Sequence, residues 1–172
     1  MNLKDMLERC GAVKYGDFTL TSGKKSKYYV DIKLASTQPD ILMKISEMMA
    51  EHMDKDARRI AGMELGAVPI ATALSLKTGI PYVMMRKKKK GHGTGGRIEG
   101  EIKKGEKVVI VEDVTTTGGS SVETVKVLRD FGAVVDKVLV VVDRQEGGKE
   151  ALDEIGVELI PLLTADDILS QS

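Results

Sequence analysis

The residues best suited to chemistry lie together at positions 107–121, which read KVVIVEDVTTTGGSS. Four apolar residues lead into two neighbouring carboxylates, Glu112 and Asp113, and a segment rich in hydroxyl groups and glycine follows. This order predicts a buried strand, a loop and the first turn of a helix. Glycine lets the backbone approach an anion closely, and the free N–H groups at a helix start point toward it. Further donors come from the hydroxyl groups of Thr115, Thr116, Thr117 and Ser120.

The two carboxylates cannot bind the same anion, because like charges repel. They suit the hydroxyl groups of a sugar that carries the phosphate, or a metal ion. The segment is neither a G-x-x-x-x-G-K-[ST] nucleotide loop nor a G-x-G-x-x-G fingerprint. Glycine and hydroxyl residues also occur in many loops for turn and capping reasons alone. Paired acids directly before a threonine-rich turn are rarer, and they resemble the phosphoribosyl-pyrophosphate (PRPP) signature of type I phosphoribosyltransferases.

A second candidate segment, residues 86–100, reads RKKKKGHGTGGRIEG. A run of cations is usually a solvated surface or a nucleic-acid-binding arm. The glycines favour a mobile loop instead. A run of cations that served only solubility would not need glycines, which raise the entropy cost of ordering the chain. Such a loop could close over a polyanion and neutralise pyrophosphate as it leaves the sugar. His92 would then donate to pyrophosphate or act as a general acid.

The elements that position these segments alternate between strand and helix. The expected strands are residues 59–63, 82–85, 108–111, 134–142 and 157–162. The expected helices are residues 68–77, a helix with Val122, Val125, Leu128 and Phe131 facing inward, residues 149–155 and residues 165–169. Strands that are apolar on both faces predict a parallel sheet covered by helices on both sides. We therefore expect one doubly wound α/β domain over residues 1–172.

The N-terminal part should form a smaller subdomain, or hood, over about residues 1–35. It contains a short helix that ends at Gly11 and two short strands within residues 18–31. A further helix should begin at Pro39 and continue to Met53.

The residues that are most informative about a ligand site follow or end the predicted parallel strands. They are Glu64 and Leu65, Arg86, Glu112 and Asp113, and Asp143 and Arg144. Ligands of such sheets bind outside the carboxyl ends of the strands, where the strand order reverses. Residues remote in sequence should therefore meet at one edge of the sheet.

The bulk composition points to no nucleic-acid or membrane partner. The chain has 26 basic and 26 acidic residues, few aromatic residues and one cysteine. It has no long apolar segment. A single cysteine allows no internal disulfide and fits a reducing compartment, so we expect a cytoplasmic protein.

With these motifs in order, the chain resembles the orotate phosphoribosyltransferase family, which makes orotidine 5′-monophosphate from orotate and PRPP in pyrimidine biosynthesis. The resemblance extends over nearly the whole length. The segments that carry it are FTLTSGKKSKYYVDIK, MELGAVPIAT, RKKKKGHGTGG, VEDVTTTGGS and DRQEGG.

The resemblance implies a role for each site residue. The pyrophosphate arm of PRPP would be bound by Arg86, Lys87, Lys90 and His92, with Lys90 and His92 as the catalytic residues. Glu112 and Asp113 would hold the ribose hydroxyl groups. The 5-phosphate would be enclosed by Val114, Thr115, Thr116, Thr117, Gly118, Gly119 and Ser120. Thr116 and Arg144 would contact orotate, and a guanidinium is well shaped for a bidentate grip on its carboxylate.

The resemblance also implies Mg²⁺ bound through PRPP and water, with no metal ligand from the protein. It implies a homodimer in which the basic loop reaches into the partner subunit's site. Two lysines that many relatives carry are replaced here by Thr21 and Leu65, and Lys24, Lys25 or Lys33 could compensate for them. Tyr28 and Tyr29 could face orotate or could simply pack within the hood.

Two other functions remain open from the sequence. A phosphoribosyltransferase for a purine or for uracil would share the sheet and the PRPP loop, although DRQEGG and the N-terminal block favour orotate. A PRPP-binding regulator of nucleic-acid binding would share the fold. The zero net charge, the loop histidine and the lack of a helix-turn-helix segment argue against a regulator.

Overall fold

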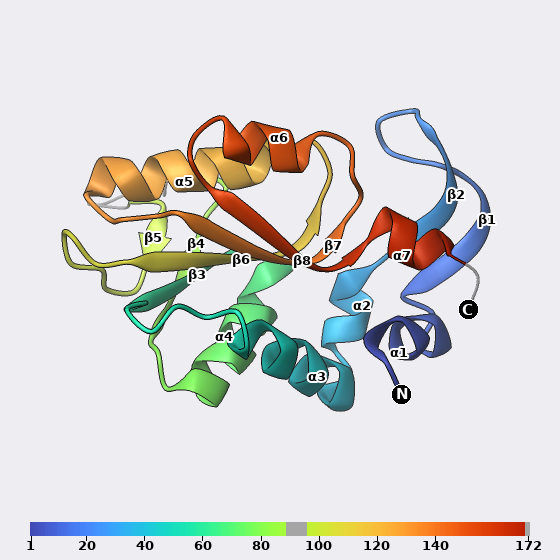
Figure 1. Cartoon of the computed structure of the whole chain (residues 1–172), viewed down its shortest axis with the longest axis horizontal. Coiled ribbons are helices and arrows are strands. Elements are labelled where there is room, and N and C mark those ends of the chain that lie inside the picture. Colours follow the sequence, from blue (N-terminus) through green and yellow to red (C-terminus); the bar gives the residue numbers. More distant parts are fainter. Residues whose placement is uncertain (89–95, 171–172) are drawn as a thin grey trace.

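The computed structural model describes residues 1–88 and 96–170 (Figure 1). The predicted catalytic residues Lys90 and His92 therefore lie outside the described residues. The strands of the central sheet are β3 (Arg59–Met63), β4 (Tyr82–Met85), β5 (Ile98–Glu99), β6 (Val108–Thr115), β7 (Lys137–Asp143) and β8 (Glu158–Thr164). The helices are α1 (Leu3–Arg9), α2 (Ile32–Ser36), α3 (Pro39–Ala50), α4 (Ala67–Thr78), α5 (Gly119–Phe131), α6 (Gly148–Asp153) and α7 (Ala165–Leu169).

The central sheet has the strand order β5-β4-β3-β6-β7-β8. Every neighbouring pair is parallel except β4 and β5, which pair antiparallel at the edge. The chain moves from β3 to β4 on one side and then crosses to β6 on the other side of β3. The strand order therefore reverses between β3 and β6, and this is where such sheets bind their ligands.

Residues along β6 alternate between two hydrophobic cores. Val109 and Val111 pack in the core that contains α3 and α4, whereas Val108 and Ile110 pack in the core under α5 and α6. All four are completely buried. Figure 1 shows α5 and α6 on one face of the sheet and α3 and α4 on the other. The predicted doubly wound α/β fold is thus confirmed. The unbroken run of apolar residues at the start of β6 follows from the burial of this strand on both faces.

A two-stranded antiparallel hairpin lies beside the sheet, at the end of the molecule where α7 also lies (Figure 1). It consists of β1 (Val13–Thr19) and β2 (Lys25–Val30), with Val13 opposite Val30. α1 and α2 attach it to the main body, because Leu7 and Ile32 pack in the same core as α3 and α4. The hairpin falls within the residues predicted to form the hood, but β1 begins at Val13, before the range of residues 18–31 predicted for the two strands.

Several strand bounds differ from the predicted ones. β3, β4 and α7 have the predicted bounds, but β6 continues through both carboxylates to Thr115 because Thr115 still pairs with Asp143. β7 begins at Lys137 instead of Val134, which forms only an isolated bridge with Lys107. The sequence analysis missed α2 and β5, which have five and two residues. Such short elements contain too few residues for a periodic pattern.

The prediction that Phe131 faces inward is wrong. The buried stripe of α5 consists of Ser121, Thr124, Val125 and Leu128, while Phe131 is 42% exposed. Phe131 is the last residue of the helix, and its ring lines an open hollow together with Ile98 and Ile102. None of the helices in the described ranges is long and apolar enough to cross a membrane.

This difference within α5 gives a test of the core. Leu128→Ala should lower the free energy of unfolding by about 3 kcal/mol, because it leaves a cavity at a completely buried position. Phe131→Ala is the matched control at the exposed end of the helix and should cost less than about 1 kcal/mol. Urea unfolding measures both values. Equal losses would contradict the placement of the two side chains.

Candidate active site

A cavity of about 380 Å³ opens at the carboxyl ends of β3 and β6. Residues 112–121 line one side of it, and residues 63–66 line the other. Two basic side chains, Lys33 and Lys87, complete the lining. The cavity thus lies at the point where the strand order reverses, and residues 112–121 of the segment that the sequence singled out line it.

The two sides of this cavity come into very close contact. An ideal Cβ atom on Gly66 would lie 2.0 Å from the Asp113 Oδ2 atom, so a larger residue would displace the carboxylate. A Cβ atom on Gly148 would likewise lie 2.3 Å from the Thr115 methyl carbon. The glycines therefore allow the loop after β3 and the start of α6 to approach the end of β6.

Glu112 is a buried carboxyl group at the base of the cavity. It is 5% exposed, and its Oε1 atom accepts a hydrogen bond of 3.1 Å from the Ser121 hydroxyl group. Burial, reinforced by the negative charge of Asp113, raises the pKa of the Glu112 carboxyl group from 4.5 to about 7. The carboxyl group is therefore partly protonated near neutral pH. Hydroxyl groups that donate hydrogen bonds to it would stabilise its charged form.

Asp113 is less buried and faces a lysine. Its Oδ2 atom lies 4.0 Å from the Lys33 Nζ atom, while its Oδ1 atom accepts from the backbone N–H of Val114 at 2.9 Å. On the opposite side, the Glu64 Oε1 atom accepts from the backbone N–H of Lys87 at 2.7 Å. This bond joins the ends of β3 and β4, so that Lys87 lies at the cavity.

A second cavity of about 610 Å³ lies between the hairpin and the sheet. It shares five lining residues with the first: Lys33, Asp113, Val114, Thr116 and Thr117. Residues 18–22, Lys24 and Tyr29 line it from the hood, and Arg144 lines it from the end of β7. The two cavities are therefore adjacent, with Asp113 and Lys33 at their boundary.

Arg144 is held tightly in this second cavity. The residue is 9% exposed, and its guanidinium carbon lies 4.3 Å from the centre of the Tyr28 ring. Its Nη2 group donates to the Ser26 hydroxyl oxygen at 3.0 Å. Its buried Nε–H group makes no hydrogen bond within the described part of the chain, and the Glu146 Oε1 atom lies 4.0 Å from it as an ion-pair partner. A buried donor without a hydrogen bond is costly, so this group indicates a place for a ligand acceptor.

Most of the predicted site residues come together in the structure. Those that line the first cavity are Lys87, Glu112, Asp113, Val114, Thr115, Thr116, Thr117, Gly118, Gly119 and Ser120. Thr116 and Arg144 meet in the second cavity. Arg86 lines neither cavity; its Nε group pairs with Glu99 at 2.7 Å. Lys90 and His92, as stated, lie outside the described residues.

The three lysines that could compensate for Thr21 and Leu65 have different positions. Lys33 lines both cavities, Lys24 lines only the second, and Lys25 donates to the Thr19 hydroxyl oxygen at 2.7 Å. Tyr28 is buried with its ring against the Arg144 guanidinium, whereas Tyr29 lines the second cavity. Glu64 was expected at the ligand-binding edge of the sheet but was given no contact there, and Gly66 and Ser121 were given no role. Their spacing from the acids gave no signal, because the contacts arise only in the folded sheet.

The fold and the first cavity together define a phosphoribosyltransferase. Comparison with known proteins agrees, since residues 36–160 match the phosphoribosyl transferase domain family. The orotate phosphoribosyltransferase of Methanocaldococcus jannaschii is 53% identical over 98% of this chain and 96% of its own length. The enzyme of the same name from Pyrococcus horikoshii is 50% identical over 98% of this chain and 94% of its own length.

Solved structures give the same result. The orotate phosphoribosyltransferase of Aeropyrum pernix is 36% identical and has a TM-score of 0.88, with 98% of this chain and 96% of that chain covered. The enzyme from Mycobacterium tuberculosis, solved in complex with PRPP, is 33% identical with a TM-score of 0.80, and 96% of each chain is covered. The chain belongs to the orotate phosphoribosyltransferase family.

The buried carboxyl group gives a pH-dependent prediction for stability. Between pH 4.5 and about 7, folded Glu112 keeps a proton that the unfolded chain has lost, so the stability of the wild type falls as the pH rises through this window. Glutamine has no such proton. From pH 4.5 to pH 8, Glu112→Gln should therefore gain up to ~3 kcal/mol in free energy of unfolding relative to the wild type.

Urea unfolding of the ligand-free protein at both pH values measures this gain. Glu150→Gln, an exposed position on α6, is the matched control and should show no such trend. A difference for Glu112→Gln that is independent of pH would mean that burial does not raise the pKa of Glu112.

Proposed function

We propose that this protein transfers the ribose 5-phosphate group of PRPP to N1 of orotate and thereby forms orotidine 5′-monophosphate and pyrophosphate. The observation that carries the proposal is the junction of the two cavities at Asp113 and Lys33. A sugar bound by the carboxylates in the first cavity would turn its reactive carbon toward a base in the second. The relatives at about half identity carry the name of the enzyme for this reaction.

The first cavity suits the phosphoribosyl group. Glu112 and Asp113 would accept hydrogen bonds from the two ribose hydroxyl groups, which favour the charged form of a carboxylate. Residues 114–120 would surround the 5-phosphate, with hydroxyl donors and the N-terminal N–H groups of α5 directed toward it. The buried Thr115 hydroxyl group lacks a hydrogen-bond partner among the described residues, which supports a ligand at this place.

The pyrophosphate arm would extend toward the loop after β3 and toward Lys87. Arg86, Lys90 and His92 are proposed to join Lys87 on this arm, with Lys90 and His92 as the catalytic residues that stabilise charge on the leaving pyrophosphate. The bond from carbon 1 to the pyrophosphate oxygen breaks as the bond from orotate N1 to carbon 1 forms. The transfer needs no covalent bond to the protein.

Orotate would occupy the second cavity, with its carboxylate on Arg144. The guanidinium is held by Tyr28 and Ser26 on one side, and its Nε–H group, which lies 4.0 Å from the Glu146 Oε1 atom, makes no hydrogen bond among the described residues. A planar guanidinium that is already oriented matches a carboxylate with two parallel hydrogen bonds. Thr116 lines both cavities and would contact orotate near the bond that forms.

Mg²⁺ is proposed as the cofactor, carried mainly by the oxygens of PRPP and by water. The described residues contain no cluster of three acidic, histidine or cysteine side chains that could hold a metal ion by itself. The carboxylates of Glu112 and Asp113 line the cavity and are oxygen donors of the kind that Mg²⁺ accepts, directly or through water. When bound, the ion would neutralise part of the pyrophosphate charge.

We also propose the domain organisation, the oligomeric state and the cellular location of the enzyme. The chain would act as one catalytic domain over residues 1–172, with about residues 1–35 as the hood. It would form a homodimer in which the basic loop of one subunit completes the site of the other. It would work in the cytoplasm, on small-molecule substrates and without nucleic acid.

Ultraviolet absorbance tests the reaction and its base together. Orotate mixed with the protein, PRPP and Mg²⁺ should lose absorbance only when PRPP is present, and added pyrophosphate should reverse the loss. Parallel samples with uracil, hypoxanthine and adenine should not change. Turnover of another base in place of orotate would keep the PRPP site and overturn the role of Arg144. No turnover of any base by folded dimeric protein would favour the PRPP-binding regulator.

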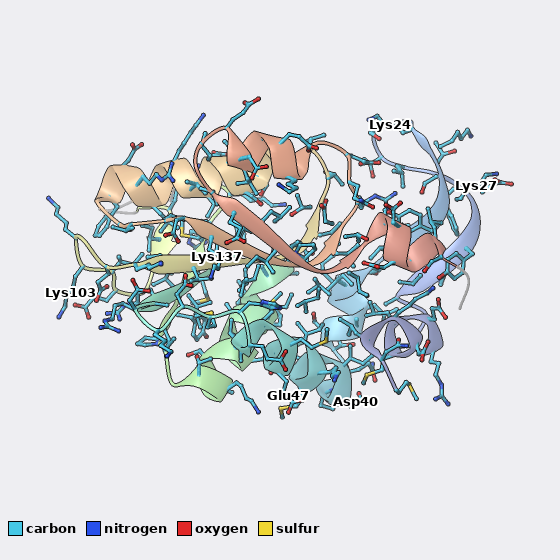
Figure 2. All side chains as sticks on the ribbon, in the orientation of Figure 1. Lys24, Lys27, Asp40, Glu47, Lys103 and Lys137 are labelled. Carbon is cyan, nitrogen blue, oxygen red and sulfur yellow. The ribbon has the colours of Figure 1, made fainter. Side chains whose placement is uncertain are left out.

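Lys33 gives a second test, because it lies at the boundary of the two cavities. Lys33→Ala should lower kcat/KM for PRPP by about 10- to 100-fold, since a hydrogen bond between charged groups is worth about 1.5–3 kcal/mol. Lys33→Arg should recover most of the activity. Lys27→Ala is the matched control: this exposed lysine lies on the hairpin and pairs with Asp17, away from both cavities (Figure 2).

Steady-state kinetics with PRPP as the varied substrate measures all three variants. Loss of activity in Lys27→Ala equal to that in Lys33→Ala would assign the effect to the general charge of the hood. Full activity of Lys33→Ala would remove Lys33 from the site.

A further inference from the structure

The residue after Arg144 has an unusual backbone. Among the described residues, Gln145 is the one residue other than glycine with a φ in the left-handed region, at 58°. This conformation is unfavourable for a side chain with a Cβ atom, so neighbouring contacts must maintain it. The backbone N–H of Gln145 donates to the Asp143 Oδ1 atom at 2.9 Å, and that bond fixes one side of the turn.

The Gln145 side chain fixes the other side of the turn by a paired contact with α7. Its Oε1 atom accepts from the backbone N–H of Asp166 at 2.9 Å, and its Nε2 group donates to the Asp166 Oδ2 atom at 3.2 Å. Two hydrogen bonds between the same two residues define the position and orientation of the amide. We refer to this contact as the Gln145–Asp166 pair.

α7 is itself anchored, so the pair has a fixed partner. The Tyr15 hydroxyl group lies 2.8 Å from the backbone oxygen of Ile168 and 2.5 Å from the Glu8 Oε1 atom, so its single hydrogen is shared between two acceptors. The Lys4 ammonium group donates to the backbone oxygen of Ser170 at 2.6 Å. Thr164 and Asp167 cap the start of the helix reciprocally. The turn after β7 is therefore tied, through α7, to β1 and α1 of the N-terminal part.

Arg144 lies between these fixed points. Its backbone N–H donates to the Thr115 oxygen at 2.9 Å, which continues the pairing of β6 with β7. Its guanidinium is held by Ser26 and Tyr28 of β2. The next residue is then fixed by α7. We propose that the Gln145–Asp166 pair is a positioning device that holds the Arg144 guanidinium at the angle needed for the carboxylate of orotate.

This proposal rests on the proposed contact between Arg144 and orotate. It predicts that loss of the pair affects the base and not PRPP, because the first cavity contains neither Gln145 nor Asp166. Gln145→Gly removes the side chain and tolerates a positive φ, so the fold should be kept. This variant should raise KM for orotate about tenfold, with KM for PRPP and kcat changed less than about twofold.

A charge exchange provides the matched control. Gln145→Glu places a second carboxylate against Asp166 and should raise KM for orotate at least as much as Gln145→Gly. In the double variant Gln145→Glu/Asp166→Asn, the amide and the carboxylate exchange places, and the new carboxylate still accepts from the backbone N–H of residue 166. The double variant should return KM for orotate to within about threefold of the wild type.

Steady-state kinetics, with each substrate varied in turn, measures the two KM values of every variant. Thermal unfolding checks that each variant keeps its fold. A rise in both KM values, or no recovery in the double variant, would overturn the positioning role. Arg144→Lys distinguishes a failure of the Gln145–Asp166 pair from a failure of the proposed contact between Arg144 and orotate. If it raises KM for orotate but Gln145→Glu does not, the pair has no positioning role. If Arg144→Lys leaves KM for orotate unchanged, the proposed Arg144 contact fails and the role of the pair fails with it.

Discussion

The contact between the loop after β3 and the end of β6 determines the arrangement of the rest of the site. The Asp113 carboxylate occupies the space that a side chain on residue 66 would need, so the two segments can meet only through glycine. They meet where the strand order reverses, and there the ends of β3 and β6 face a common opening. If they were further apart, the carboxylates for the sugar would be separated from Glu64 and Lys87.

The distribution of charge in the first cavity follows from this contact. Three carboxyl groups, those of Glu64, Glu112 and Asp113, line a cavity that is proposed to receive a polyanion. Two of them carry less uncompensated charge than their number implies: Asp113 lies 4.0 Å from the Lys33 ammonium group, and Glu112, the most buried, has a raised pKa and is partly neutral near pH 7. Glu64 accepts a hydrogen bond from the Lys87 backbone N–H but keeps its charge.

The sequence predicted what depends on local pattern. The bounds of β3, β4 and α7, and the place of the loop of residues 114–120 at the first cavity, followed from apolar runs, glycines and hydroxyl residues. β6 was predicted too short, because only its pairing with β7 keeps the two carboxylates extended. The placement of Lys33 beside Asp113 joins residues 80 positions apart, and no periodicity encodes such a contact. Arg86, which the resemblance assigns to the pyrophosphate arm, pairs with Glu99 and lines neither cavity, and this pairing too joins residues that no periodicity connects.

In the proposed function, the first cavity binds the phosphoribosyl group that all such enzymes share, and the second cavity selects the base. The residues matched by the phosphoribosyl transferase domain family begin at position 36, and apart from Lys33 they supply the whole lining of the first cavity. The second cavity takes much of its lining from residues 18–33, before the matched range. Arg144 lies within the matched range, yet Ser26 and Tyr28 of the hairpin orient its guanidinium. If the base binds in the second cavity as proposed, its recognition requires the hairpin and the sheet to be held in one arrangement. The hydrogen bonds from β1 and α1 to the segment containing α7 maintain that arrangement at a distance from the reacting atoms.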